Sequence, residues 1–364
     1  MITILLFIVA FFFAINIGAS GAAASMGIAY GSNAIRNKRI ALFLCGIGVF
    51  LGAVLGGEEV VKTLGSEIIP ENIISLHIAL IIISSASLSL FIANLSGIPL
   101  STSEVTVGAV AGVGIAFQIL YVKTLLVIVA FWIIVPITSF LLAFFANKII
   151  QYLQKKILNL TKGKWSKILA IGVIITGFFE AFSAGMNNVA NSVGPLVAAG
   201  LLSMEQGTFY GGIFIALGAI FLGGKVIETN GKRITKLSLM QGGAVSGIGA
   251  TLVIIASIFG IPVPHTQVTT CSILGVGASD LGKALWKKTI ITKLVKTWVI
   301  SPFFSLVISY NLVKVIIQSD LSGLMLFLLF MATVFAIGIW QPKTLTKSQP
   351  LYKEKAIPKK LGGS

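Results

Sequence analysis

The chain is a succession of apolar runs, and this pattern restricts its possible folds more than any other feature. The runs cover residues 2–17, 40–55, 73–95, 107–119, 125–145, 168–182, 209–222, 244–259, 268–276, 298–317 and 321–340. In a bilayer every backbone N–H and C=O must be satisfied within the protein, so spans are helices or closed barrels. A helix needs about 20 apolar residues to cross, and several runs reach that length with their neighbouring Gly, Ala and Ser residues.

Composition argues against a soluble fold. Of the 364 residues, 56% are hydrophobic and 10% are charged, whereas soluble domains carry about 25% charged residues. The 39 glycines suit helices that pack closely without a hydrophobic drive between them. The sequence therefore predicts an all-α, polytopic membrane protein with about 10–12 transmembrane segments, some of them half-spans.

Two long apolar runs end in the same kind of break. Residues 97–108 read GIPLSTSEVTVG, and residues 260–271 read GIPVPHTQVTTC. Gly and Pro stop a helix, and irregular backbone at membrane depth survives only where it is buried in protein or lines a polar cavity. Paired breaks in two halves of a chain point to the binding site of a transporter. We therefore expect a broken or re-entrant helical hairpin at each break, and the sequence leaves open whether each one crosses or re-enters.

The second half of the chain repeats the first. Phe12–Gly27 aligns with Phe179–Gly194, residues 60–65 align with 226–231, and residues 97–114 align with 260–277. The offsets are 163 to 167 residues, and a nearly constant offset over separated blocks indicates duplication. The predicted domains are an N-terminal transmembrane repeat (1–147), a basic cytoplasmic linker (148–166), a C-terminal transmembrane repeat (167–342) and a basic cytoplasmic tail (343–364).

Charge on matching loops indicates that the repeats are inverted. The basic stretch 36–39 matches residues 202–205, which carry no Lys or Arg, while Lys62 alone matches a region that is followed by Lys232, Arg233 and Lys236. Repeats of one orientation would carry like charge on matching loops, because positive residues stay on the cytoplasmic side. The alternation therefore predicts inverted-topology repeats, with the linker and the C-terminus in the cytoplasm. The net charge of +16 belongs to these loops and the tail, and nucleic acid is not an expected partner.

Three amide side chains fall in one apolar run, within the block Gly185–Ser192 that reads GMNNVANS. Asn187 and Asn191 are four residues apart, so they share a helix face. Amides at membrane depth are costly unless they bind a ligand or bond to another helix, and both readings stay open. The matching block of the first half, Gly18–Ser25, offers only small residues and backbone.

Hydroxyl groups follow the breaks. Ser101, Thr102 and Ser103 stand in the first copy, and Pro264, His265 and Thr266 take the same places in the second. A helix that begins there also aims its free N–H groups and positive dipole end at the site, which suits an anion. Ordinary helix capping by Ser and Thr is the alternative explanation.

Few ionisable groups fall at membrane depth, and Glu104, Glu180 and His265 are the clearest. A carboxylate inside a membrane segment is a functional candidate by default. Burial favours the protonated form of a carboxylate, so Glu104 and Glu180 are the candidates to carry a coupling proton. The sequence has no nucleotide loop, no metal-spaced His/Cys cluster and no soluble domain, so an enzyme is not expected.

In these blocks the chain resembles the inorganic phosphate transporter (PiT) family, and the resemblance extends along nearly its whole length. That family carries two copies of G-A-N-D-V-A-N-[SA]-x-G and two of G-x-P-V-S-T-T-H, and residues 185–195 and 97–104 match them clearly. Within the family it looks most like the sulfate permease branch of Gram-positive bacteria, whose blocks stand unchanged at Asn16–Gly27, Gly97–Ala109 and Phe178–Asn191. The resemblance implies an ion-coupled carrier of a tetrahedral oxyanion.

The chain departs from the phosphate pattern at several motif positions. Gly21 and Asn188 replace the family's two motif aspartates, Glu104 and Gln267 replace the His of its hairpin motif, and Lys62 replaces the Glu of its V-x-E-T block. Phosphate keeps a proton at neutral pH and benefits from an acceptor such as Asp, whereas sulfate has no proton to donate. The exchange favours sulfate, and it weakens the case for Na⁺ because carboxylates are natural ligands of hard cations.

The sequence thus predicts a secondary active transporter that imports sulfate across the cytoplasmic membrane by alternating access, with H⁺ favoured over Na⁺ as coupling ion. A symporter of phosphate or another tetrahedral oxyanion is the alternative, followed by an anion channel. The predicted substrate-binding residues are Ser20, Gly21, Ser101, Thr102, Ser103, Asn187, Asn188, Asn191, His265 and Thr266. The predicted coupling-ion residues are Glu104 and Glu180, with no metal or other cofactor. Sulfate and membrane lipid are the expected partners, and a homodimer is left open.

Overall fold

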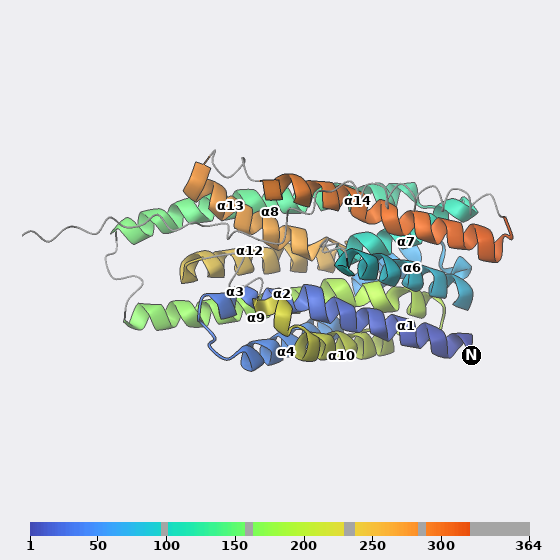
Figure 1. Cartoon of the computed structure of the whole chain (residues 1–364), viewed down its shortest axis with the longest axis horizontal. Coiled ribbons are helices and arrows are strands. Elements are labelled where there is room, and N and C mark those ends of the chain that lie inside the picture. Colours follow the sequence, from blue (N-terminus) through green and yellow to red (C-terminus); the bar gives the residue numbers. More distant parts are fainter. Residues whose placement is uncertain (96–100, 157–162, 229–236, 283–288, 321–364) are drawn as a thin grey trace, which may run out of the picture.

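The computed structural model describes residues 1–95, 101–156, 163–228, 237–282 and 289–320. Within these ranges the regular structure is helical, without strands, and the helices lie along one long axis as an elongated bundle (Figure 1). The predicted all-α fold class is confirmed.

The helices follow one another with short connections. The first half contains α1 (Ile2–Ile17), the π-helical turn η1 (Gly18–Ala22), α2 (Ala23–Ser25), α3 (Gly27–Gly31), α4 (Lys38–Gly56), α5 (Glu58–Lys62), the π-helical turn η2 (Thr63–Glu67), the 3₁₀ turn η3 (Glu71–Ile73), α6 (Leu76–Leu95), α7 (Thr102–Phe117) and α8 (Val122–Lys156). The second half contains α9 (Lys164–Ala198), α10 (Met204–Leu222), α11 (Gly224–Glu228), α12 (Leu239–Ile258), α13 (His265–Leu281), α14 (Thr289–Leu312) and the π-helical turn η6 (Val313–Ile317).

Seven helical stretches among the described residues are long and apolar enough to cross a membrane. They are Ile2–Ser25, Lys38–Gly56, Val122–Lys156, Lys164–Ala198, Met204–Leu222, Leu239–Ile258 and Ile300–Ile317. A multi-pass membrane protein is therefore confirmed. The apolar run 321–340 and the predicted tail 343–364 lie outside the described residues.

Both hairpins re-enter rather than cross. α7 ends beside the segment that precedes α6, where the Tyr121 backbone N–H donates to the Ile68 carbonyl at 2.9 Å. In the second hairpin, Gln241 in the first turn of α12 donates to Asp280 in the last turn of α13 at 3.2 Å. Each hairpin therefore enters and leaves at one end of the bundle. The tip of the first hairpin, residues 96–100 with Gly97, lies outside the described residues.

Glycines allow the long helices to approach one another backbone to backbone. A Cβ on Gly52 of α4 would lie 1.9 Å from the Phe182 carbonyl oxygen of α9, and a Cβ on Gly218 of α10 would lie 2.1 Å from the Ile15 carbonyl oxygen of α1. Gly218 lies 166 residues after Gly52, and Phe182 lies 167 residues after Ile15, which are the offsets of the repeated blocks. The two contacts therefore join equivalent positions of the repeat. Any side chain at these positions would force the helices apart.

The half-spanning helices α7 and α13 each pack on the last long helix of the other half. α7 lies along α14, where a Cβ on Gly112 would lie 2.3 Å from the Leu306 carbonyl oxygen. α13 lies along α8, where a Cβ on Gly275 would lie 2.2 Å from the Phe140 carbonyl oxygen. The two half-spans start near the middle of the bundle and run toward opposite ends (Figure 1). This is the arrangement expected for inverted repeats, and the repeat itself stays a prediction.

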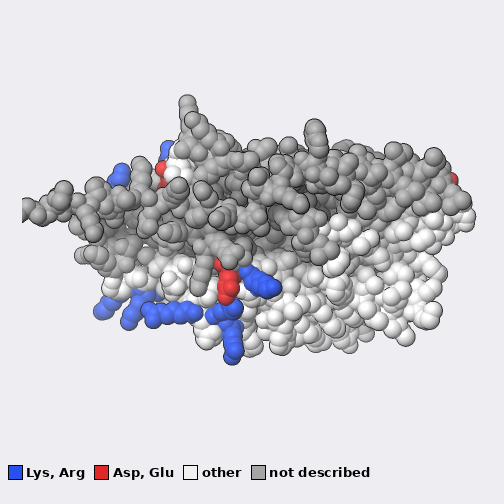
Figure 2. Space-filling view, viewed as in Figure 1, with Lys and Arg blue, Asp and Glu red and all other residues white. Residues whose placement is uncertain are grey.

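The predicted linker 148–166 consists largely of helix ends. α8 continues through Lys156 and α9 begins at Lys164, so that residues 157–162 are the part outside the described residues. On the face shown in Figure 2, the described Lys and Arg side chains gather toward the left of the view, where these two helix ends lie in Figure 1. A bundle end rich in Lys and Arg is what the positive-inside rule expects of the cytoplasmic side.

Candidate functional site

The amide residues of α9 meet the start of α7. The Ser103 hydroxyl donates to Asn187 Oδ1 at 3.2 Å, and the Thr102 hydroxyl donates to Asn188 Oδ1 at 2.9 Å. Ser103 and both amides are buried. The structure thus brings together two sequence-predicted groups that lie 84 and 86 residues apart in the chain.

Asn187 also holds the second break. Its Nδ2 donates to the Ser257 hydroxyl at 3.0 Å and to the Ile261 carbonyl at 3.1 Å, and its Oδ1 accepts from the Val263 backbone N–H at 3.2 Å. Together with the bond from Ser103, these contacts use both donors and both acceptor positions of the amide. We therefore assign Asn187 to positioning the two breaks, which is the interhelical role that the sequence had left open.

Asn188 keeps hydrogen-bonding capacity. Its Oδ1 accepts from Thr102 and, at 3.2 Å, from Asn191 Nδ2, while its own Nδ2 donates to none of the described residues. Asn191 lies one turn further along α9, and its Oδ1 is buried and has no hydrogen-bond partner among the described residues. Asn188 and Asn191 are therefore the amides of the cluster that can still bond to a ligand.

The first turn of α7 begins with a capping serine. The Ser101 hydroxyl accepts from the Glu104 backbone N–H at 3.4 Å, so ordinary capping, the alternative explanation, applies to Ser101. The second break has no capping side chain of this kind, because the residue before α13 is Pro264, which provides no side-chain hydrogen bond to the first turn. Thr266 lies half-buried in the first turn of α13, and no hydrogen bond of its side chain falls within the described residues.

Ser20 and Gly21 lie in η1, the π-helical turn that follows α1. The Ser20 hydroxyl donates to the Asn16 carbonyl at 2.7 Å. Gly21 is buried, yet a Cβ added there would meet no neighbouring atom within 4 Å. η1 packs against α9 and α10, but within the described residues no hydrogen bond joins Ser20 or Gly21 to the amide cluster. π-helical turns inside longer helices are frequent at functional sites.

A second polar cluster surrounds Glu180 of α9. Its carboxylate accepts from the Thr269 hydroxyl at 2.7 Å and lies beside Ser246. Glu180 is 0% exposed and His265 is 5% exposed. The His265 ring lies beside the Glu180 backbone, and neither ring nitrogen makes a hydrogen bond of good geometry to the described residues. The structure thus places two of the sequence-predicted groups, Glu180 and His265, next to each other.

Glu104 of α7 bonds to its own counterpart in the other half. Gln267 Nε2 donates to Glu104 Oε1, and the two residues are 163 apart, which is the offset between the two breaks. Glu104 is 2% exposed and also lies beside Ser301 of α14. The pairing of Glu104 with Gln267 was not predicted from the sequence. The predicted inverted repeat contains a signal for it, since equivalent positions of two inverted halves would meet at the axis that relates the halves.

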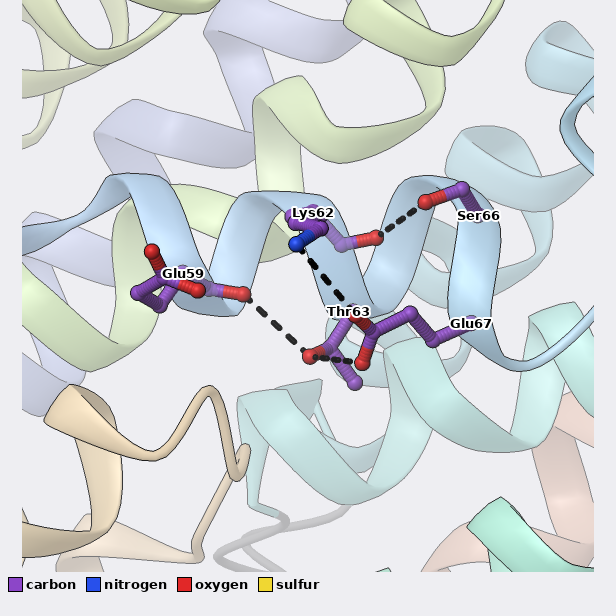
Figure 3. Close-up of polar contacts among 5 residues, drawn as sticks. All are labelled: Glu59, Lys62, Thr63, Ser66 and Glu67. Atoms are coloured by element: carbon purple, nitrogen blue, oxygen red, sulfur yellow. Dashed lines mark hydrogen bonds and ion pairs between the residues drawn. The ribbon is translucent and has the colours of Figure 1, made fainter.

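The first-half V-x-E-T block contacts the second break directly. A Cβ on Gly260, whose φ is +68°, would lie 2.7 Å from Thr63 Oγ1 and 3.0 Å from the Glu59 carbonyl oxygen. Figure 3 shows the Thr63 hydroxyl between that carbonyl, at 3.2 Å, and Glu67 Oε2, at 2.9 Å. Lys62 Nζ lies 3.9 Å from Glu67 Oε1. Because both side chains are largely exposed, this ion pair contributes little to stability.

Two re-entrant hairpins whose half-helices meet at a buried polar centre, within a multi-pass membrane protein, are an arrangement typical of membrane transporters. No group of three or more metal-ligating side chains stands among the described residues. The sequence pattern of the phosphate transporter family matches residues 17–309. The chain belongs to this family.

Similar proteins agree with that assignment. The chain is 57% identical over 309 residues to the sulfate permease CysP of Bacillus subtilis (strain 168), covering 85% of this chain and 86% of that one. It is 27% identical to the putative phosphate permease TK2061 of Thermococcus kodakarensis, covering 85% and 96%. A solved structure described as the sodium-dependent phosphate transporter has a TM-score of 0.76 and 26% identity, covering 87% of this chain and 99% of that chain. The predicted resemblance to the family and to its sulfate permease branch is confirmed.

Proposed function

We propose that this protein is a secondary active transporter that imports sulfate across the cell membrane by alternating access. The observation that carries the proposal is Asn188, a buried amide that bonds to the first turn of α7 and keeps its Nδ2 available. The family pattern has an aspartate at this position. The 57% identity to a protein named a sulfate permease supports the same substrate.

The chemistry of Asn188 favours sulfate over phosphate. Phosphate at neutral pH carries a proton that a carboxylate can accept, whereas sulfate carries none. A carboxylate facing sulfate would be a repulsion between like charges in a site of low dielectric constant. An amide at this position offers N–H groups to sulfate, and phosphate loses the acceptor that its proton needs.

Both halves contribute to the proposed site. On the α7 side, Thr102, Asn188 and Asn191 form one hydrogen-bonded group. The repeat relation assigns Gly21 and His265 to the corresponding places on the other side, because they match Asn188 and Thr102. Ser20 and Thr266, the neighbours of Gly21 and His265 in the sequence, are further proposed substrate-binding residues on that side. Asn187 holds the start of α7 and the second break in position.

The test is uptake of labelled sulfate into vesicles that contain the purified protein, with and without excess phosphate. Phosphate should compete poorly. Asn188→Asp should lower sulfate uptake by about tenfold or more, because the added like charge costs more than about 1.4 kcal/mol. Asn37→Asp is the matched control, since Asn37 is exposed at the N-cap of α4 and an aspartate there can still accept from the Arg39 backbone N–H. Phosphate outcompeting sulfate in the unaltered protein would overturn the proposal.

We assign H⁺ as the coupling ion, carried by Glu104 or Glu180, with Na⁺ as the alternative. Both carboxylates are buried, bond to neutral groups, and form no ion pair with a described Lys or Arg. An imposed pH gradient, acid outside, should drive uptake, and either Glu104→Gln or Glu180→Gln should abolish that dependence. Uptake that follows a Na⁺ gradient and ignores the pH gradient would contradict the assignment.

Phosphate is the second candidate substrate, supported by the solved relative at 26% identity that is described as a phosphate transporter. The competition experiment separates the two anions. Flux that ignores both ion gradients and does not saturate would instead favour an anion channel.

A further inference from the structure

A cavity of about 700 Å³ lies between α7, α8, α13 and α14, and none of the amides of α9 lines it. Its walls are almost entirely apolar and include two tryptophans, Trp132 and Trp298. The Trp132 indole N–H donates to the Pro262 carbonyl at 2.9 Å, so that this ring is held in place. The polar side chains of the lining, Glu104 and Gln267, bond to each other.

Both halves of the chain line the cavity, and several of the lining residues occupy equivalent positions in the two halves. Trp132 and Trp298 are 166 residues apart, and so are Pro136 and Pro302, while Ala111 and Leu274 are 163 apart. These are the offsets of the repeated blocks, and all six residues line the cavity. The cavity therefore lies on the boundary between the halves, where α7 and α13 pack on their long partner helices.

The cavity opens on the outer apolar surface of the bundle. Ile133, Ile137 and Phe303 line it and are 59%, 54% and 59% exposed. They belong to α8 and α14, within the stretches Val122–Lys156 and Ile300–Ile317 that can cross a membrane. An opening on that surface faces the hydrocarbon region of the bilayer, where lipid acyl chains are the surrounding medium.

We propose that this cavity is a binding site for an acyl chain of a membrane lipid. Its volume falls within the range of small-molecule pockets, about 300–1,000 Å³, and its apolar and aromatic lining is typical of them. An anion is unsuited to it, because the lining contains no Lys, Arg or His. A bound chain fills the space between the half-spans and stabilises α7 on α14 and α13 on α8.

The test uses Trp132 as a probe in the full-length protein. The other four tryptophans, Trp165, Trp286, Trp298 and Trp340, are replaced by Phe, and the protein is reconstituted in phosphatidylcholine vesicles with brominated acyl chains. Bromine quenches indole fluorescence on contact, so strong quenching of Trp132 is expected. Ala111→Phe fills the cavity from α7 and should remove most of the quenching. Ala130→Phe adds the same ring at an exposed position of α8 outside the cavity and should leave it unchanged.

Quenching that persists fully in Ala111→Phe would overturn the proposal, because Trp132 would then meet only lipid outside the cavity. Cys271→Phe fills the cavity from α13 and serves as the second filled variant if Ala111→Phe fails to fold. It should remove most of the quenching of Trp132 in the same way. Absence of quenching in the unfilled protein, together with dimers in a cross-linking assay, would assign the cavity to a second copy of the chain and overturn the lipid site. Sulfate is not used in this test, so its outcome is independent of the proposed function.

Discussion

At the scale of single residues, the polar centre depends on one buried amide. Asn187 bonds to Ser103 of α7, to Ser257 of α12 and to Val263 of the second break. A hydrogen bond between membrane helices contributes only about 0.6 kcal/mol on average. The larger effect is geometric, because the same amide holds the start of α7 and the second break together on α9.

Asn187→Ala should therefore destabilise the protein by about 2 kcal/mol, because four groups lose a partner in a buried place. Thermal unfolding of the purified protein in detergent measures the change. Asn16→Ala removes an amide that bonds only within α1 and should have little effect. Equal unfolding temperatures for the two variants would contradict the positioning role of Asn187.

The importance of these amides could be predicted from the sequence, but their separate roles could not. An amide inside an apolar run is costly, so its presence indicates either a ligand or a partner helix. Asn187 and Asn188 are neighbours, and they differ in the direction in which each points around the helix axis. The packing of α9 against α7 and α12 decides which amide is saturated and which keeps its N–H groups.

At the scale of elements, the half-spans depend on glycine contacts with the opposite half. A Cβ on Gly112 of α7 would lie 2.1 Å from Ser309 Oγ and 2.3 Å from the Leu306 carbonyl oxygen of α14. Gly112→Ala should destabilise the protein by about 1–3 kcal/mol, the usual cost of overpacking. Gly172→Ala on α9 is the matched control, since a Cβ there meets no neighbouring atom within 4 Å. The control should be neutral or should stabilise by up to about 1 kcal/mol, because Ala favours the helix. Unfolding temperatures of the two variants check both expectations.

The hairpins followed from the sequence, and their partners did not. Gly-Ile-Pro at residues 97–99 and 260–262 ends a helix by its covalent structure. The packing of α7 on α14 and of α13 on α8 has no comparable signal, because lipid-facing and protein-facing sides of a membrane helix are equally apolar. The sequence also does not reveal that α8 and α9 extend into the predicted linker, because long basic helix ends and a basic loop have the same composition.

At the scale of the whole molecule, two described parts of the chain mark the opposite ends of the bundle. The loop before α6, which contains Glu71, lies at one end, and the end of α8 at Lys156 lies at the other. We expect the Lys156 end to be cytoplasmic, since Lys and Arg are retained on that side. An impermeant thiol reagent on intact cells should label Glu71→Cys, whereas Lys156→Cys should react only after permeabilisation. The native Cys45 and Cys271 are buried and give a low background. The reverse pattern would invert the orientation.

The bond between Glu104 and Gln267 has a consequence for how the two halves can move. In a transporter built from inverted halves, the outward-open and inward-open shapes arise when each half adopts the conformation of the other. Under that exchange most contacts turn into different ones, whereas a contact between equivalent positions is converted into itself. The Glu104–Gln267 pair is such a contact. It is therefore expected to stay closed at both extremes of the cycle while the contacts around it change, which favours Glu180 over Glu104 as the carboxylate that opens to each side in turn.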